Sequence, residues 1–239
     1  MNEDLSDIKY SPIRDYNYAQ YFESLNYNGK TLTEKERSEL VTFIDEQVSQ
    51  HSSGLPLIQD ILESSRNQQD EYHVIENTVA SVMLFLTLTM TDCLTASKYF
   101  LIADNDYDRR FMRGKMMVIL NEGFKRLYGF EAKTHKKSEW NRLKPLMSHF
   151  SPIIQSQYEE LSSRLDQHAR SSSWWKDERN LETHLDAERL YMSRQEEVIE
   201  SKVMMDNSKL YGTLLATFEF LMNVHAYFNN VLVDKYCSG

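Results

Sequence analysis

Apolar residues recur at helical spacing along much of the chain, and the longest such run extends from Tyr72 to about Ala103. A period of 3.6 residues places one set of side chains on a single face of a helix. Because this set is wide enough to make the segment apolar on nearly all sides, we expect it to be the central helix of a bundle. The face is formed by Ile75, Val79, Val82, Leu86, Met90, Cys93, Ser97 and Phe100, and is widened by Met83, Phe85 and Leu88.

Two shorter helices are predicted before this run. Thr33 followed by Glu36 has the capping-box pattern of a helix start. The helix that begins there ends at the break 52–54, which reads Ser-Ser-Gly. Pro56 fits the first turn of the second helix, and residues 64–70 are read as a polar loop.

A helix of about 23 residues is predicted after the central run. It begins at Asn105 or Asp106 and ends near Tyr128, because Gly129 is a good C-terminal stop. This helix carries much of a basic region through Arg109, Arg110, Arg113, Lys115, Lys125 and Arg126.

The rest of the chain is read as one short helix and two longer ones. The short helix follows Ser138, and Pro145 disturbs it. A helix from about residue 152 runs to about Arg170, and the last long helix spans about 205–234. The core face of this last helix is predicted to contain Leu210, Leu214, Thr217, Phe218, Leu221, Val224, Phe228 and Val231.

These patterns predict an all-α protein, a helical bundle with long central helices and additional N-terminal helices. Seven Gly and four Pro are few for 239 residues, whereas an all-β chain needs many turn residues. We divide the chain into an irregular N-terminal arm (1–30), N-terminal helices packed on the bundle (31–70) and the main bundle (71–239).

Charge is distributed unevenly along this acidic chain, whose net charge is −9. The segment from Lys98 to Lys144 contains twelve Lys and Arg and six Asp and Glu, whereas the rest of the chain contains 15 Lys and Arg and 30 Asp and Glu. A uniformly acidic surface would repel nucleic acid, whereas a local basic face suits RNA or a phosphorylated partner. We expect no DNA partner. Solvated helix faces would give the same pattern.

Cysteine usage and the N-terminal residues indicate a cytoplasmic protein. Only Cys93 and Cys237 are present, so neither a disulfide framework nor a zinc pattern is predicted. The acidic start of the chain lacks the basic and apolar regions of a secretory signal. The longest uncharged stretch, 77–91, is shorter than the ~20 residues of a membrane span. We therefore expect no membrane partner, and no cofactor.

The stretch Arg-Asn-Leu-Glu-Thr-His, from Arg179 to His184, carries the strongest candidate chemistry. On a helix, Asn180 and His184 share a face and Arg179 lies beside it. Asn180 can hold the imidazole in one tautomer, while His184 accepts a proton from a ribose 2′-hydroxyl or returns one to a leaving 5′-oxygen. Arg179 can bind the phosphate and offset the charge that develops on it. Since the 2′-oxygen is the nucleophile, no metal is needed.

This spacing resembles the Arg-x(4–6)-His motif of the HEPN superfamily, in which the residue after Arg is often polar, as Asn180 is. The resemblance covers these six residues and the helical context from about residue 72 onward, and it does not extend to residues 1–70. It implies a bundle with the motif next to a final core helix. In many members it implies a metal-independent endoribonuclease of toxin–antitoxin, phage-defence or RNA-processing systems, with an active site shared across a homodimer. Other members have lost catalysis and act as binding modules.

Two further pairs in the chain match the motif's spacing without its helical setting. Arg142 and His149 are separated by Pro145, which breaks the helix between them. Arg66 lies in a polar loop and His73 at a helix start, so these two side chains would not share a rigid face. Arg179 to His184 is the one match with tight spacing in the expected position.

Asp92 and Glu122 are predicted to be supporting carboxylates, because the resemblance implies an acidic or polar residue from another core helix near the histidine. Asp92 is the better candidate, since it is the only charge between Glu76 and Lys98. The alternative is a capped or ion-paired carboxylate in the core, where burial without a partner would be costly.

Two functional hypotheses remain open. The first is a HEPN-like ribonuclease that cleaves RNA by 2′-hydroxyl transesterification. The second is a non-catalytic helical module that binds a protein partner or regulates a neighbour, with the motif on a solvated helix whose acids pair with its arginines. A metal site is not predicted, because the chain has no Glu-x-x-His or His-x-x-x-His pair.

Overall fold

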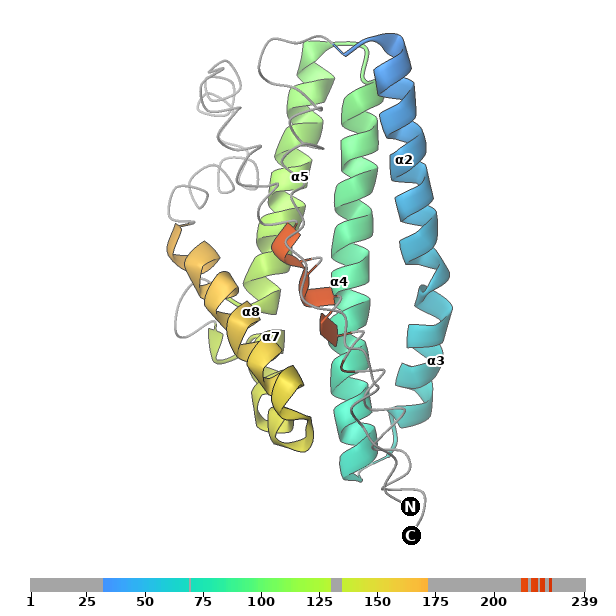
Figure 1. Cartoon of the computed structure of the whole chain (residues 1–239). Helices are drawn as coiled ribbons and strands as arrows, with labels where there is room; N and C mark the ends of the chain where they lie inside the picture. The colour runs from blue at the N-terminus through green and yellow to red at the C-terminus, as the bar shows by residue number, and fades with distance from the viewer. Residues whose placement is uncertain are drawn as a thin grey trace.

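The computed structural model describes residues 32–68, 70–129, 135–171, 212–214, 216–218, 220, 221 and 224. Regular structure in these residues is entirely helical, and long helices pack as a bundle, which confirms the predicted all-α class (Figure 1). The predicted arm, 1–30, lies outside the described residues. The elements are α2 (Glu34–Ser53), α3 (Leu55–Ser65), α4 (Glu71–Ile102), α5 (Asp106–Leu127), α7 (Glu139–Leu143), the 3-10 helix η2 (Lys144–His149) and α8 (Pro152–Ser171).

The N-terminal helices begin and end where their capping signals lie. Glu36 N donates to Thr33 Oγ1 at 3.3 Å, and Thr33 N donates to the Glu36 carboxylate at 2.8 Å, so both halves of the predicted capping box are formed. α2 ends at Gly54, and Pro56 lies in the first turn of α3. α3 continues to Ser65, so the polar loop is shorter than predicted at its start.

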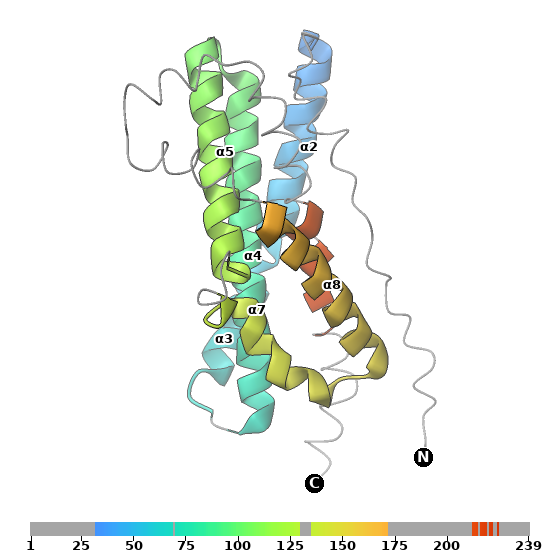
Figure 2. The same cartoon turned by 90° about the vertical axis from the view of Figure 1, so that its left-hand side faces the viewer.

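α4 is the central helix, as predicted, with α5 along one side and α2 and α3 along another (Figures 1 and 2). The predicted stripe is buried throughout, at Ile75, Val79, Val82, Leu86, Met90, Cys93, Ser97 and Phe100. Met83 is buried as well, whereas Leu88 is 46% exposed. The prediction was wrong for Leu88 because it lies on the one side of α4 that no other described helix covers.

Within the described ranges, α4 alone is long and apolar enough to cross a membrane. α4 extends well beyond the uncharged stretch 77–91. Asp92, the first charged residue after that stretch, is exposed on the helix and does not interrupt it. Most of its apolar window is buried by the rest of the bundle, as in the core helix of a soluble protein. α4 is therefore consistent with a soluble protein.

α4 and α5 approach closely where Gly123 faces Thr89. A Cβ atom added at Gly123 would lie 2.5 Å from Cγ2 of Thr89, so only glycine fits this crossing without a shift. The Thr89 hydroxyl donates to the Phe85 carbonyl of its own helix at 2.9 Å. The contact between the two helices at this point therefore depends on shape rather than on an interhelical hydrogen bond.

The described C-terminal residues are helical and belong to the core. The predicted core face is confirmed where it is described, with Leu214, Thr217, Leu221 and Val224 buried and Phe218 partly buried. Phe218 lies edge-on to His51 of α2, with ring centroids 6.1 Å apart. Phe220 contacts Trp140 of α7, with ring centroids 5.7 Å apart. These residues therefore join α2 to the α7–α8 side of the bundle.

Candidate nucleic-acid interface

The predicted catalytic residues Arg179, Asn180 and His184 lie outside the described residues, and their roles stay predictions. The two predicted supporting carboxylates are described. Asp92 is exposed on α4, so the alternative of a carboxylate buried in the core does not apply. Glu122 is exposed on α5, with its carboxylate 3.7 Å from Nζ of Lys125.

The described residues on either side of 172–211, the stretch that contains the motif, meet at one place on the bundle, which we call the anchoring point. His168, in the last turn of α8, is hydrogen-bonded through Nε2 to Oγ1 of Thr213 at 2.7 Å. The His168 ring also lies edge-on to Phe124 of α5, with centroids 6.2 Å apart. Because Arg179 follows the end of α8 by eight residues, chain geometry keeps it within about 28 Å of that end. The anchoring point therefore limits the part of the bundle that the motif can reach.

The basic region of the sequence separates into two groups at opposite ends of α5. The first group, which we call the hairpin end, surrounds the α4–α5 connection and contains Lys98, Arg109, Arg110, Arg113 and Lys115 together with Asp104, Asp106 and Asp108. The second group, the basic end, contains Lys125, Arg126, Lys136, Lys137, Arg142 and Lys144 together with Glu122 and Glu139.

At the hairpin end the charges are largely matched by neighbours. Lys98 Nζ contacts the Asp45 carboxylate of α2 at 2.6 Å. Arg109 donates to Asp106 at 3.0 Å and to the Ala103 carbonyl at 3.2 Å. The contact between Lys98 and Asp45 joins α4 to α2, and the contacts of Arg109 stabilise the turn between α4 and α5. The charges of Lys98 and Arg109 therefore serve contacts within the fold.

At the basic end six cations stand against two acids. Glu139 is 16% exposed and is shared between two arginines, with Arg142 at 2.6 Å and Arg126 at 3.7 Å. Within the described part of the chain, no ion pair involves the exposed Lys136, Lys137 or Lys144. The net positive charge that the sequence places between 98 and 144 is therefore concentrated at this end of the bundle.

Both arginines of the basic end are held in place while remaining open to solvent. The Arg126 guanidinium lies over the Phe85 ring of α4, 4.7 Å from its centroid, and its side chain is 64% exposed. The Arg142 side chain is half exposed. Since a guanidinium can bind a phosphate through two parallel hydrogen bonds, this pair suits a phosphodiester backbone.

Hydrogen bonds between described residues link the end of α5 to the start of α7 and so bring the two halves of the basic end together. α5 ends at Leu127 with Tyr128 as its cap, and the following Gly129 has a left-handed φ of 84°. The His135 ring is hydrogen-bonded through Nδ1 to the Tyr128 carbonyl at 2.9 Å. Ser138 Oγ donates to the His135 carbonyl and accepts from Asn141 N, which caps α7 as predicted.

An aromatic cluster supports the basic end from inside the bundle (Figure 2 shows α7 beside α8 and the C-terminal end of α5). Trp140 stacks on Tyr158 of α8 with centroids 4.6 Å apart, and its Nε1 donates to Ser162 at 2.8 Å. Tyr158 donates its hydroxyl to the Trp140 carbonyl at 3.2 Å. Burial is the main cause that raises the pKa of the Tyr158 phenol far above its usual value, so it stays neutral and serves packing.

Tyr128 links this cluster to the anchoring point of the motif segment. Its hydroxyl lies near the Ser162 carbonyl at 3.4 Å, and its ring packs against His135 with centroids 4.4 Å apart. Burial raises the pKa of the Tyr128 phenol, Asp166 raises it further and Arg170 opposes the rise. Tyr128 therefore lies close enough to the last turns of α8 for the charges of Asp166 and Arg170 to affect its pKa.

Sequence reasoning located the basic region but did not divide it, and it missed several residues that shape it. The pairing of Arg126 with Glu139 and Phe85 joins three segments, and no local pattern indicates it. The contact of His168 with Thr213 spans an even longer separation. The only local signal was the spacing of Glu139 and Arg142, three residues apart on one helix.

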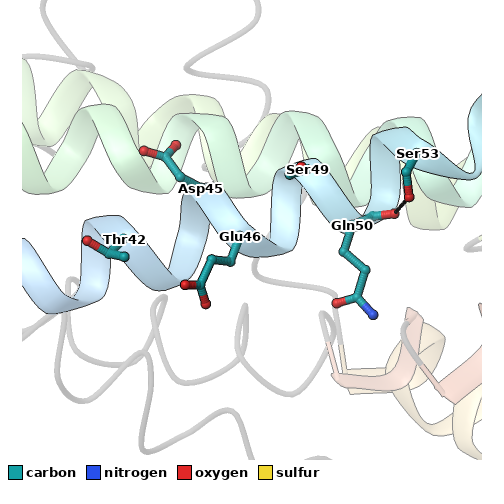
Figure 3. Close-up of a pocket in the computed structure, with 6 residues that line it drawn as sticks. All are labelled: Thr42, Asp45, Glu46, Ser49, Gln50 and Ser53. Carbon is teal, nitrogen blue, oxygen red and sulfur yellow. Dashed lines mark hydrogen bonds between the residues drawn. The ribbon is translucent and has the colours of Figure 1, made fainter.

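A polar hollow on α2 is a weaker candidate. Figure 3 shows its lining residues along one helix: Thr42, Asp45, Glu46, Ser49, Gln50 and Ser53. All six are exposed, and Asp45 is already bound by Lys98. In addition, among the residues that the structure describes, no group of three His, Cys, Asp or Glu side chains could hold a metal ion. The hollow therefore offers an acidic helix face with no enclosed ligand site.

The basic end is the region of the described bundle best suited to a polyanion. It combines an excess of cations, two positioned guanidiniums and closeness to His168, near the end of α8. Comparison with known proteins adds no constraint, because the chain matches no protein-family model, no curated protein and no solved structure.

Proposed function

We propose that this protein is a cytoplasmic, homodimeric HEPN-like endoribonuclease that binds RNA at the basic end and cleaves it without a metal. The observation that carries the proposal is the position of the basic end beside the anchoring point of the motif segment. His168 contacts both Thr213 and Phe124, and Phe124 directly precedes Lys125 on α5. This closeness supports the assignment of phosphate binding at the basic end and of catalysis by Arg179 and His184 to one site.

The proposed reaction is an internal transesterification. The ribose 2′-oxygen attacks the adjacent phosphorus, the bond from phosphorus to the 5′-oxygen breaks, and a 2′,3′-cyclic phosphate forms. His184 accepts the proton of the 2′-hydroxyl or supplies one to the leaving 5′-oxygen, and Asn180 orients its imidazole. Arg179 binds the phosphate and stabilises the charge that grows on its oxygens. Asp92 and Glu122 are proposed as supporting groups from α4 and α5.

RNA cleavage by the purified full chain tests this proposal. Single-stranded RNA is incubated with the native protein in excess EDTA, and the products are examined for 2′,3′-cyclic phosphate ends. His184→Ala and Arg179→Ala should each reduce cleavage by at least about 100-fold, the size typical of losing an acid–base group or a charge-stabilising group. Circular dichroism should show that the helical content is unchanged.

The chain offers a matched control for these substitutions. Arg66 and His73 also follow the spacing of the motif, but Arg66 lies in an exposed turn after α3 and His73 is paired with Asp70 at 2.6 Å. Arg66→Ala and His73→Ala should therefore leave cleavage unchanged. Cleavage that survives both His184→Ala and Arg179→Ala rules out the proposed mechanism.

The second candidate is a non-catalytic helical interaction module. It is supported by the exposed apolar side chains on the uncovered side of α4 and by the net charge of −9. This candidate predicts RNA retention or protein binding with no strand cleavage at any protein concentration. Product analysis of the native chain therefore separates the two candidates directly.

A further inference from the structure

The basic end presents cations to solvent. All of its lysines and arginines are exposed: Lys125, Arg126, Lys136, Lys137, Arg142 and Lys144. An ammonium or guanidinium group donates hydrogen bonds and accepts none, which matches the oxygens of a phosphate group. The edges of the bases, in contrast, differ from one another in their pattern of donors and acceptors. To distinguish all the bases, this end would therefore need open acceptors or exposed rings in addition to its cations.

The carboxylates of the basic end are engaged by its own cations. Glu122 lies 3.7 Å from Nζ of Lys125, and Glu139 contacts Arg142 at 2.6 Å and Arg126 at 3.7 Å. A carboxylate identifies cytosine by accepting a hydrogen bond from the amino group of the base. Because both acids already face positively charged groups, they neutralise cations of this end and are poorly placed to identify a base.

The asparagine amides near the basic end bind carbonyl groups of the chain itself. Asn141 Nδ2 donates to the Lys136 carbonyl at 3.2 Å. Asn121 is buried, and its Nδ2 donates to the Met117 carbonyl at 2.9 Å. An amide identifies adenine through two simultaneous hydrogen bonds, one donated and one accepted. Since the amino group of each amide is directed toward a carbonyl of the chain, neither asparagine is oriented for that arrangement.

The aromatic rings of this part of the bundle are directed inward. Every described Phe, Tyr and Trp between 122 and 171 is buried: Phe124, Tyr128, Trp140, Phe150 and Tyr158. The Phe85 ring of α4 is covered by the Arg126 guanidinium. Proteins hold the bases of single-stranded RNA mainly by stacking them on exposed rings, at about 1–3 kcal/mol per base. The described residues of the basic end therefore provide no ring on which a base can stack.

We infer that the basic end binds the phosphate backbone of RNA and not its bases, so that its contribution to affinity is the same for every base sequence. The inference rests on the proposed function, because it takes RNA as the ligand of this surface. It deepens that function by assigning the choice of cleavage site to groups outside the basic end. Exposed donors without open acceptors or rings bind what all RNA chains share, which is the phosphodiester.

Short 2′-O-methyl oligonucleotides test the inference with the full chain, because the blocked 2′-oxygen cannot attack the phosphate. One strand contains uridine alone, and in the others alternate positions are adenosine, cytidine or guanosine. Fluorescence anisotropy gives the affinity of the native chain and of the combined Lys136→Ala, Lys137→Ala and Lys144→Ala variant for each strand. The variant should lose affinity by the same factor for every strand, within about threefold, and its salt slope should become shallower by the same amount. A loss that differs more than this between strands overturns the inference.

Two controls keep an equal loss informative. Circular dichroism and the midpoint of urea unfolding should match those of the native chain, which excludes a uniform loss caused by unfolding. Arg142→Lys keeps the positive charge but removes the planar fork that could bind guanine through O6 and N7. Its effect should again be equal for every strand, and a selective loss for the guanosine strand overturns the inference.

The same measurements separate a failure of this inference from a failure of the proposed function. A native chain that binds none of the strands removes RNA binding at the basic end, and the inference with it. A native chain that binds RNA, but loses affinity unequally when the lysines are replaced, removes the inference alone. A base preference of the native chain that the lysine variant retains in full supports the inference, because the groups that identify the bases then lie outside the basic end.

Discussion

The two ends of α5 carry similar numbers of cations but use them differently. At the hairpin end, Lys98 and Arg109 are engaged by Asp45, Asp106 and a backbone carbonyl, so their charge stabilises the fold. At the basic end, one partly buried acid, Glu139, is shared by two arginines, and three lysines have no ion pair within the described chain. A similar number of basic residues therefore stabilises contacts between helices at one end and forms an electropositive surface at the other.

The contribution of a cation to the binding of an anion depends on the acidic side chains that lie near it in the folded structure. A lysine next to a carboxylate contributes little long-range potential, because the pair is nearly neutral at a distance. The basic end also has an aromatic cluster beneath it, in which Trp140 of α7, the helix that carries Arg142, packs on Tyr158 and Phe220.

Removal of the aromatic support should have the largest effect. Trp140 is 1% exposed and stacks on Tyr158, so Trp140→Ala should lower the free energy of unfolding by about 3–5 kcal/mol. Urea unfolding followed by circular dichroism measures the change. Tyr107→Ala at the hairpin end is the matched aromatic control, because Tyr107 is 65% exposed, and it should change stability by less than about 0.5 kcal/mol. Equal losses at the two sites would contradict the comparison.

The close approach of α4 and α5 near the basic end should be the next most sensitive feature. Gly123→Ala should destabilise the fold by about 1–3 kcal/mol, because the new Cβ would lie 2.5 Å from Thr89 Cγ2. Thr89→Ala in the same chain should recover part of that loss, which a double-mutant cycle measures.

Gly54→Ala serves as the control for the glycine substitution. The nearest atom to a Cβ at Gly54 is the His51 carbonyl oxygen at 3.7 Å, and the backbone there is right-handed helical. This change should therefore be neutral or slightly stabilising. A loss at Gly54 as large as that at Gly123 would indicate that the α4–α5 crossing is not special.

RNA affinity should then distinguish the two ends of α5. The combined change of Lys136, Lys137 and Lys144 to Ala should weaken RNA binding by about tenfold at moderate salt and make the salt slope shallower by about 2. The matched hairpin-end set is Arg109, Arg110 and Lys115 to Ala, which should weaken binding by less than about threefold. Fluorescence anisotropy at several salt concentrations measures both sets, and equal losses would remove the basic end as the interface.

The smallest expected effect comes from the shared acid. Glu139→Gln removes the negative charge between Arg126 and Arg142, so RNA binding should strengthen by about two- to threefold. Asp106→Asn at the hairpin end changes net charge by the same amount and should leave RNA binding nearly unchanged. Weaker binding after Glu139→Gln would show that this acid positions the arginines more than it neutralises them.

Local sequence signals predicted the helices of the described chain well. Thr33 with Glu36, Asn105 and Ser138 all cap the helices that they were expected to begin, because capping depends on residues only three positions apart. Pro145 coincides with the change from α7 to the 3-10 helix η2. The motif from Arg179 to His184 is also a local signal, but its surroundings lie outside the described residues.

Long-range pairing could not be predicted in the same way. Leu88 continues the apolar pattern of α4, yet it is exposed because α5 and α2 pack on either side of it. Arg126 and Lys98 look alike in the sequence, yet one lies over Phe85 with most of its side chain in solvent and the other is held by Asp45. Such differences depend on which helices become neighbours.

The all-α class, the helix boundaries and the central position of α4 follow from the residues alone, because periodicity, caps and breakers act within a few turns of chain. The packing of the helices sets which cations of the described chain lie near acids, where His168 meets Thr213, and that Leu88 is exposed on α4. Burial and charge neutralisation depend on distances between residues far apart in the chain, and these distances are fixed only when the helices pack.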